Sequence, residues 1–460
     1  MTKRKRARQR RQYLSQSSAG DFGSCPRKFY YSRILGLSLR PEHQPLYLDE
    51  GKLWHELLDR SIYGEVKRLC QDMPKAISIQ DAVDEWTKEH IRQLEERQKN
   101  QQFDFVSDSV TVEQIEDKAR MWIDIANRYR DKYLQKDIEN YQLLGTEVKF
   151  RFPLRVPCNK CNGETLMDGP YCGKCSGTGL GRKSPKWDAM GIIDRIVRER
   201  KTNRVLVIES KTTGDTPVGY MTGAWSRAQS RLYLLGAEHW LKEQGVDSTA
   251  DGIIYDVVRK KVPSVPKMTQ CRTCKSTGEM DKPTLERYAK RMKKKNPAKA
   301  LFAEGQLQSM GESDSAPCPE CEGTGVGGIS RAACDTTVDV FRATVEKYPH
   351  IKEAEYLETL LKLEQVGDVR FMNREEFFVE RKKQYEWMLD AYFKAREIDT
   401  MRYWYRNESA CDRPFPCAFS RLCIDGGEGA MDYYWTRDEK EEQEREEQER
   451  QQAANEDPFL

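Results

Sequence analysis

The sequence predicts a mixed α/β fold in which a central sheet is flanked by helices and interrupted by two cysteine-rich insertions. Strand-like apolar runs at 191–197 and 204–210 are joined by a polar turn, which is typical of a β-hairpin. Segments with apolar residues at helical spacing precede and follow this hairpin. Two CxxC pairs lie between the strand-like runs 151–156 and 187–197, and two more follow another such run at 252–261. Both places are loops that tolerate inserted domains.

The predicted hairpin carries two carboxylates and a lysine. Asp194 lies on its first strand and Glu209 on its second, so the two side chains can meet across the hairpin. Magnesium and other hard divalent cations prefer such oxygen ligands. Lys211 shares a strand face with Glu209 and could hold a water molecule beside the metal. This combination indicates phosphodiester hydrolysis, although the same residues on neighbouring strands also occur as ordinary charges.

Two helical segments supply three further candidates. His55, one of five histidines, lies in the amphipathic segment 51–59. Gln229 and Tyr233 are four residues apart and therefore share one face of the helical segment 228–235. Alone, the histidine would be interpreted as a packed or capping residue, and the Gln/Tyr pair as part of a helix surface and core. Their order along the chain favours a functional role.

In chain order the set is His, Asp, Glu-x-Lys and Gln-x-x-x-Tyr, and this order resembles the RecB-like branch of the PD-(D/E)XK nucleases. The resemblance implies a restriction-endonuclease-like mixed sheet core flanked by helices. It also implies these roles: magnesium or manganese ligands at His55, Asp194 and Glu209, an orienting lysine for the nucleophilic water at Lys211, and support of the site and the DNA strand by Gln229 and Tyr233. Glu147, on the strand-like segment just before, is a weaker additional acidic candidate.

Four cysteines near the two ends of the chain form another candidate site. Cys411, Cys417 and Cys423 recur with five residues between neighbours, and Cys25 could supply a fourth thiolate. A subset of RecB-like nucleases holds a 4Fe-4S cluster with one Cys before the His motif and three after the Gln-x-x-x-Tyr motif. The resemblance therefore implies such a cluster here, although the family's first two triplet cysteines are often closer together. Zinc in the same thiolates, or free structural thiols, are the alternatives.

The CxxC pairs predict two structural zinc ions. Two pairs complete one closed, tetrahedral four-thiolate shell that leaves no open position for water. The segments CGKCSGTG and CPECEGTG resemble the knuckles of DnaJ-type chaperones, in which glycines let the backbone turn tightly around the metal. Neighbouring pairs could share an ion, or the pairs could cross, first with fourth and second with third. Both schemes use Cys158, Cys161, Cys172, Cys175, Cys271, Cys274, Cys318 and Cys321.

The expected organisation has six parts. They are a basic disordered arm (1–12), a helical N-terminal part (13–142), the nuclease core (143–262) with the first zinc-knuckle insertion at 157–183, the second insertion (263–328), a helical C-terminal part (329–424) and a charged tail (425–460). Within them, the basic segment 285–299 is expected to be helical and is a candidate DNA contact, although lysine runs are usually solvated faces. The aromatic-rich segment 374–402 is expected to form one long helix.

Composition restricts the functional class further. A net charge of +3, with 33% charged residues, does not by itself indicate nucleic-acid binding. No signal segment or run of 18 apolar residues is present, so we expect a cytoplasmic protein, in a bacterial host cell if a phage encodes it. The family resemblance implies a DNA nuclease, an exonuclease more than an endonuclease, and a bacteriophage context, because stand-alone members of that family occur widely in phages. The nuclease would act on DNA ends or single strands, alongside recombination or replication proteins. The alternative is a non-catalytic, zinc-containing DNA-binding or recruitment protein on a nuclease scaffold.

Overall fold

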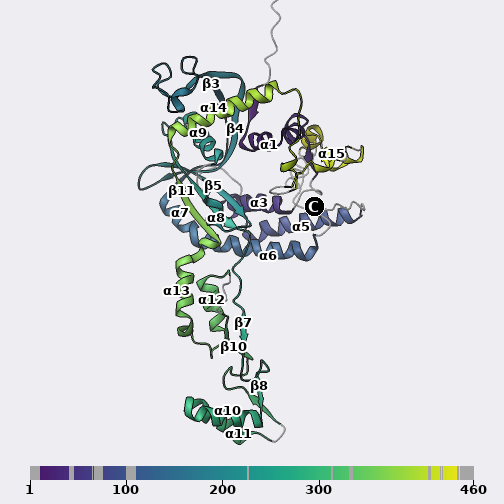
Figure 1. Ribbon diagram of the computed structural model, residues 1–460, viewed down its shortest axis with the longest axis vertical. Coiled ribbons are helices and arrows are strands. Elements are labelled where there is room, and N and C mark those ends of the chain that lie inside the picture. The colour runs from purple at the N-terminus through teal and green to yellow at the C-terminus, as the bar shows by residue number, and fades with distance from the viewer. Residues whose placement is uncertain are drawn as a thin grey trace, which may run out of the picture. The chain divides into compact units, whose positions relative to one another are not determined.

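The computed structural model shows two compact units (Figure 1). It describes residues 11–40, 46–64, 66, 76–99, 110–224, 227–311, 314–330, 335–412, 416–424, 426, 428–442 and 445. The first unit comprises residues 1–215, 219–260 and 374–460, and the second comprises 216–218 and 261–373. Residues 1–10 and 446–460, which include most of the predicted arm and part of the predicted tail, lie outside the described residues.

A mixed six-stranded sheet forms the centre of the first unit, which confirms the predicted fold class. Its strands are β1 (Gln12–Leu14), β3 (Tyr141–Pro157), β4 (Leu180–Glu199), β5 (Val205–Thr213), β6 (Ala250–Arg259) and β11 (Met372–Phe377). The order is β1-β4-β5-β6-β11, and β3 also pairs with β4. The β3/β4 and β4/β5 pairs are antiparallel, whereas β1/β4 and β5/β6 are parallel. The predicted hairpin is therefore the β4–β5 pair.

Helices cover both faces of this sheet. They include α1 (Gln16–Ser24), α3 (Leu46–Glu56) with its π-helical continuation η3 (Leu57–Ile62), α5 (Ile79–Lys99), α6 (Val112–Tyr129), α7 (Gln135–Asn140), α9 (Ala228–Glu243) and α14 (Arg381–Thr400). Within β5, Val205 and Val207 belong to the main core with α9 and α14, whereas Leu206 and Ile208 belong to a smaller cluster on the other face. By the same alternation Glu209 lies on the α9 face. None of the helices in the described ranges is long and apolar enough to cross a bilayer.

The helices of the opposite face are held by an aromatic cluster. Thr111 caps α6 through a reciprocal capping box with Gln114. The buried stripe of α6 includes Trp122, which stacks on Trp54 of α3 at 5.8 Å between ring centroids. Tyr129, at the end of α6, packs edge-on against Trp54. The helix that carries His55 is thereby fixed beside the sheet.

The expectation of one helix over 374–402 was wrong in its first part. Met372–Phe377 is strand β11 at the edge of the sheet, and the helix begins only at Arg381. The polar side chain of Arg374 explains the strand, because it reaches Asp137 at 2.6 Å and Asp256 at 3.0 Å beneath the sheet. The hydrophobic pattern of the segment around Arg374 gives no information about these distant acidic partners, so it could not predict the strand.

The first cysteine-rich segment is the tip of the β3–β4 hairpin. Pairing of these strands continues to Pro157 and Leu180, and the segment between them contains two CxxC motifs.

The second cysteine-rich segment lies in the second unit. That unit contains β7 (Met268–Gln270), β8 (Glu279–Asp281), α10 (Lys282–Lys295), α11 (Pro297–Ser309), β9 (Ser315–Pro317), β10 (Val326–Ile329), α12 (Val338–Glu346) and α13 (Leu357–Val366). The predicted basic helix over 285–299 is divided at Asn296, where α10 ends and α11 begins.

Candidate metal centre

Asp194 and Glu209 lie where two neighbouring strands separate. The pairing of β4 with β5 ends at Arg195 and Ile208, while β4 remains paired with β3, and β5 with β6. Asp194 and Glu209 are the next residues on the two strands in this register. The backbone N–H of Ser210 donates a hydrogen bond to Oδ2 of Asp194 at 2.7 Å. The strands thus form a fork with a carboxylate on each branch.

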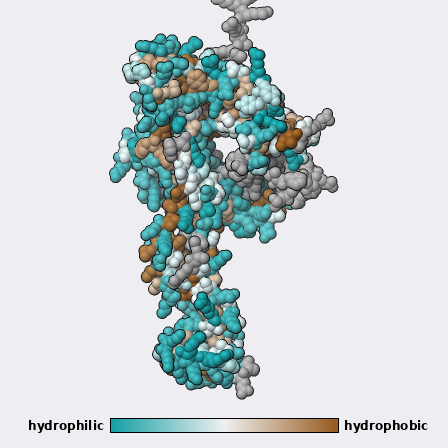
Figure 2. Space-filling view, in the orientation of Figure 1, coloured by the Kyte–Doolittle hydropathy of each residue, from teal (hydrophilic) through white to brown (hydrophobic). Residues whose placement is uncertain are grey.

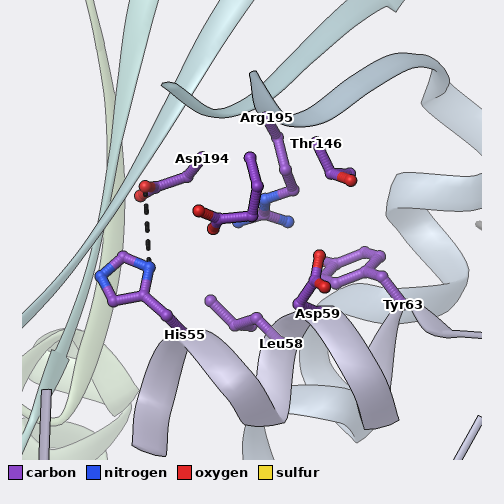
Figure 3. Close-up of a pocket in the computed structure, with 8 residues that line it drawn as sticks. His55, Leu58, Asp59, Tyr63, Thr146, Asp194 and Arg195 are labelled. Atoms are coloured by element: carbon purple, nitrogen blue, oxygen red, sulfur yellow. Dashed lines mark ion pairs between the residues drawn. The ribbon is translucent and has the colours of Figure 1, made fainter. Parts of the chain in front are cut away.

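His55, in the last turn of α3, points across this fork toward Asp194 (Figure 3). Its Nδ1 lies 3.6 Å from Oδ1 of Asp194. Asp59 and Tyr63, one and two turns further along the chain, line the same pocket. Burial lowers the pKa of His55 below its usual value, against the opposing effect of Asp194. A neutral imidazole is the form that binds a cation.

Glu147 joins this group through an unusual backbone conformation. One ligand atom from each of His55, Glu147 and Asp194 lies within 4.8 Å of the other two. Glu147 has a φ of 46°, in the left-handed region, although it lies inside β3. Side chains with a Cβ rarely adopt that conformation, and such strain is concentrated at functional sites. The structure therefore gives Glu147 a more central place than the sequence indicated.

Glu209 is almost completely buried and only partly satisfied. It is 1% exposed, and its Oε1 accepts hydrogen bonds from Lys211 and, at 2.7 Å, from Nε2 of Gln229. Its Oε2 is buried and has no hydrogen-bond partner within the described part of the chain. Burial raises the pKa of Glu209 to about 8, against the opposing effect of Lys211. A cation would supply the missing partner, so this carboxylate fits a metal ligand.

The remaining candidates surround Glu209. Burial alone would lower the pKa of Lys211, but the Glu209 and Asp194 carboxylates raise it above its usual value, so Lys211 stays cationic. Gln229 and Tyr233 lie one turn apart on α9. The Tyr233 ring packs edge-on against Phe150 of β3, with the centroids 5.9 Å apart. All six sequence-predicted residues therefore lie around the open end of the β4–β5 hairpin.

The family comparison agrees with this geometry. The sequence matches the PD-(D/E)XK nuclease superfamily over residues 13–326. The chain belongs to this superfamily. Membership indicates a nuclease, a hydrolase that acts on nucleic acid. No curated protein matches the sequence.

Sequence reasoning missed a buried polar network beneath the candidate metal site. Arg195 and Asp256, with side chains 6% and 1% exposed, are joined at 2.9 Å, and Arg195 also donates to Oγ of Ser210 at 3.0 Å. Tyr129 and Arg374 bond the same carboxylate of Asp256. The network thus holds the residues that directly follow Asp194 and Glu209. Its members are far apart in sequence, and no local pattern identifies them.

The first four-cysteine group of this nuclease joins neighbouring CxxC pairs. The Sγ atoms of Cys158 and Cys172 are 4.0 Å apart, and those of Cys161 and Cys175 are 3.7 Å apart. Four thiolates at about 2.3 Å from one tetrahedral zinc ion would be separated by about 3.8 Å. Backbone N–H groups of Cys161 and Lys160 lower the pKa of Cys158 to about 6, which favours the thiolate. The group fits a single tetrahedral ion.

The second group has the same arrangement within the second unit. Cys271 and Cys318 are 3.9 Å apart and Cys274 and Cys321 are 3.7 Å apart between Sγ atoms. The two CxxC loops of this group pack closely against each other. A Cβ added at Gly325, in one loop, would lie 2.5 Å from the carbonyl oxygen of Ser276, in the other. Of the two pairing schemes left open by the sequence, the structure shows the neighbouring one in both groups.

The four cysteines near the chain ends are arranged differently. They are not among the described groups whose ligand atoms lie within 4.8 Å of one another. Burial is the largest cause that raises the pKa of Cys411, and the nearby thiols of Cys423 and Cys25 raise it further. Burial also raises the pKa of Cys417, and Cys25 and Cys411 add to that effect. Cys411 therefore lies close enough to Cys25 and Cys423 for their charges to interact, and Cys417 close enough to Cys25 and Cys411. In a 4Fe-4S cluster each thiolate binds a different iron, so wider spacing than in a zinc site is consistent with that group.

Packing brings the two chain ends together around these cysteines. The backbone N–H of Asn407 lies 3.4 Å from Sγ of Cys25, and Trp404 stacks on Phe29 at 5.8 Å. Strand β2 (Ser38–Leu39) pairs with β12 (Tyr434–Trp435). The N- and C-terminal segments are thus in direct contact at this site.

Proposed function

We propose that the protein is a divalent-metal-dependent DNA nuclease. The buried Oε2 of Glu209, which has no hydrogen-bond partner among the described residues, carries this proposal. Glu209 lies at a fork with Asp194, and Asp194 in turn faces His55. His55, Asp194 and Glu209 would hold magnesium or manganese, with Glu147 as a further ligand.

Each side chain then has a distinct part in hydrolysis. A bound divalent cation supplies polarisation of the scissile phosphate and acidification of the attacking water. Lys211, a cation beside Glu209, positions that water and balances the negative charge of the phosphate. Gln229 donates a hydrogen bond to Oε1 of Glu209, which leaves Oε2 as the oxygen that would bind the cation. Tyr233 borders the site and would support the DNA strand. No covalent intermediate is required.

The finer assignment follows from the motif order. The set His55, Asp194, Glu209-x-Lys211 and Gln229-x-x-x-Tyr233 supports a RecB-like exonuclease that acts on DNA ends or single strands. We place it in DNA recombination, repair or replication of a bacteriophage, with recombination or replication proteins as partners.

The decisive experiment incubates labelled linear, circular and single-stranded DNA with magnesium and either wild type, Lys211→Ala or Lys201→Ala. Lys201 is an exposed lysine in the turn of the same hairpin and is the matched control. We expect degradation by wild type and Lys201→Ala and loss of it in Lys211→Ala. If wild type degrades nothing while both variants bind DNA equally, the protein is a non-catalytic DNA-binding protein.

We also propose three structural metal centres. The two CxxC groups would each hold zinc, and Cys25, Cys411, Cys417 and Cys423 would hold a 4Fe-4S cluster that joins the chain ends. Elemental analysis and an absorption spectrum of anaerobically purified protein test this. We expect roughly four iron and roughly two zinc ions per chain. Roughly three zinc ions without iron would refute the cluster.

A further inference from the structure

Helix α10 of the second unit presents a strongly basic face. Its exposed cationic residues are Arg287, Lys290, Arg291, Lys293, Lys294 and Lys295, against the single acidic residue Glu286. Arg287, Lys290 and Lys294 follow one another at three- and four-residue steps and form one stripe along the helix. Lys293 pairs with Glu304 of α11 at 2.7 Å. Within the described residues, Lys290 and Lys294 have no acidic partner.

The opposite face of α10 is fixed to the second cysteine group. Leu285, Tyr288 and Ala289 are buried in one cluster with the four cysteines. Glu320, between Cys318 and Cys321, accepts hydrogen bonds from Tyr288 of α10 at 2.7 Å and from Lys299 of α11 at 2.6 Å. Asn296 caps α11 and is followed by Pro297 at its first position, which sets a sharp reversal between the helices. The second cysteine group thus fixes the helical hairpin with its basic stripe outward.

Two apolar side chains lie exposed near the basic end of this hairpin. Leu301 is 68% exposed and Phe302 is 58% exposed, within the second turn of α11. Around them the surface over α10 and α11 is predominantly hydrophilic (Figure 2). Exposed apolar side chains next to clustered cations can contact sugars and base edges while the cations contact phosphates.

We infer that the α10–α11 hairpin is a second DNA-binding element, which binds the phosphate backbone of duplex DNA without sequence preference. This inference rests on the proposed function for the choice of DNA. Lysines dominate the stripe and carry no base-reading geometry of their own, so the contact is to phosphates. Proteins that bind single strands combine cations with several aromatic stacking platforms, and among its described residues the hairpin exposes one large aromatic side chain, Phe302.

A duplex contact outside the active site would keep the nuclease on its substrate. The second unit is joined to the first through the chain on both sides, at 260–261 and 373–374. DNA held by the hairpin is therefore at high effective concentration for the nuclease site. We expect longer duplexes to be bound more tightly than duplexes too short to reach both elements.

The test measures binding of labelled duplex DNA at several salt concentrations by full-length protein carrying Lys211→Ala. In that background, Lys290→Ala/Lys294→Ala is compared with Lys347→Ala/Lys352→Ala, which removes two exposed lysines of the same unit. Loss of two phosphate contacts should lower the slope of log affinity against log salt by about 1.8. Phe302→Ala should weaken binding without changing that slope. The control pair should match the parent, and equal zinc content will show that each variant is folded.

Three results would overturn the inference. The first is an unchanged slope for the Lys290→Ala/Lys294→Ala variant. The second, in the same titration with single-stranded DNA, is an effect of that variant confined to the single strand. The third is an equal loss of slope in the Lys347→Ala/Lys352→Ala control. Because the readout is binding, it is independent of cleavage. A reduced slope with an inactive wild type would reject the proposed nuclease activity and leave the DNA-binding element standing.

Discussion

The backbone N–H of Ser210 donates a hydrogen bond to Oδ2 of Asp194 at 2.7 Å, just beyond the last paired residues of β4 and β5. If β4 and β5 stayed paired, a backbone carbonyl of β4 would accept the hydrogen bond from Ser210. The Asp194 carboxylate takes the place of that carbonyl. Asp194 therefore closes the hairpin at the fork and also faces His55 with its other oxygen. The position of the carboxylate is set by the fold before any metal binds.

Because Asp194 has these two roles, its replacement by Asn and by Ala should have different effects on stability. Asp194→Asn keeps an oxygen that can accept from Ser210 but removes the charge, so we expect normal thermal stability and a cleavage rate lower by about 1000-fold or more. Asp194→Ala also leaves the Ser210 N–H without its partner and should cost a further 1–3 kcal/mol or so in unfolding free energy. Cleavage assays and thermal unfolding of both variants check this. Equal stability of the two variants would contradict the role of the hydrogen bond.

Metal affinity should depend on pH through Glu209. Burial raises the pKa of Glu209 to about 8, so a proton competes with the cation for this carboxyl group near neutral pH. Apparent magnesium affinity should therefore rise by about tenfold per pH unit up to about pH 8 and then level off. Calorimetry in buffers of different ionisation enthalpy should detect proton release, and Glu209→Gln should abolish it. Affinity that is constant below pH 8 would contradict this prediction.

Local patterns allowed the elements that carry the site to be predicted. Asp194 and Glu209 lie on paired strands and His55 and Gln229 on helices, as expected, because each interrupts an apolar pattern of clear period. The close association of Glu147 with His55 depends on a left-handed backbone angle, which sequence does not reveal at a glutamate.

Long-range polar contacts explain why the prediction of a single helix over 374–402 was wrong in its first part. Arg374 lies in a strand because its guanidinium reaches Asp137 and Asp256 beneath the sheet. In sequence, the segment that contains it continues into a helical pattern without a break. Tertiary contacts outweigh local preference there.

The buried network should contribute strongly to stability. Burial alone would raise the pKa of Asp256, but Arg374 and Arg195 lower it below its usual value. The ionised Asp256 carboxylate therefore stabilises the folded protein above about pH 4, and this contribution to the free energy of unfolding is lost as the pH falls below that value. We expect Asp256→Asn to cost about 3–5 kcal/mol at neutral pH, because two buried arginines lose their counter-charge. The difference from wild type should shrink in acid.

A matched control for that variant is Asp117→Asn. Asp117 pairs with Arg120 on the exposed face of α6, so its loss should cost about 1 kcal/mol or less. Chemical unfolding of both variants at neutral and acidic pH makes the comparison. A similar cost for the two variants would show that burial of the Asp256 network contributes little.

Loss of zinc should unfold a larger part of the chain at the second proposed zinc site than at the first. Cys318 is completely buried in a cluster that forms the core beneath α10 and α11, helices of 14 and 13 residues. Cys318→Ser should release one zinc ion, reduce the helical circular dichroism and expose 282–309 to proteases. Cys158 lies at a hairpin tip, in a cluster of cysteines alone, so Cys158→Ser should release one zinc ion with little loss of helix. Loss of both ions in either variant would contradict the neighbouring pairing of the CxxC motifs.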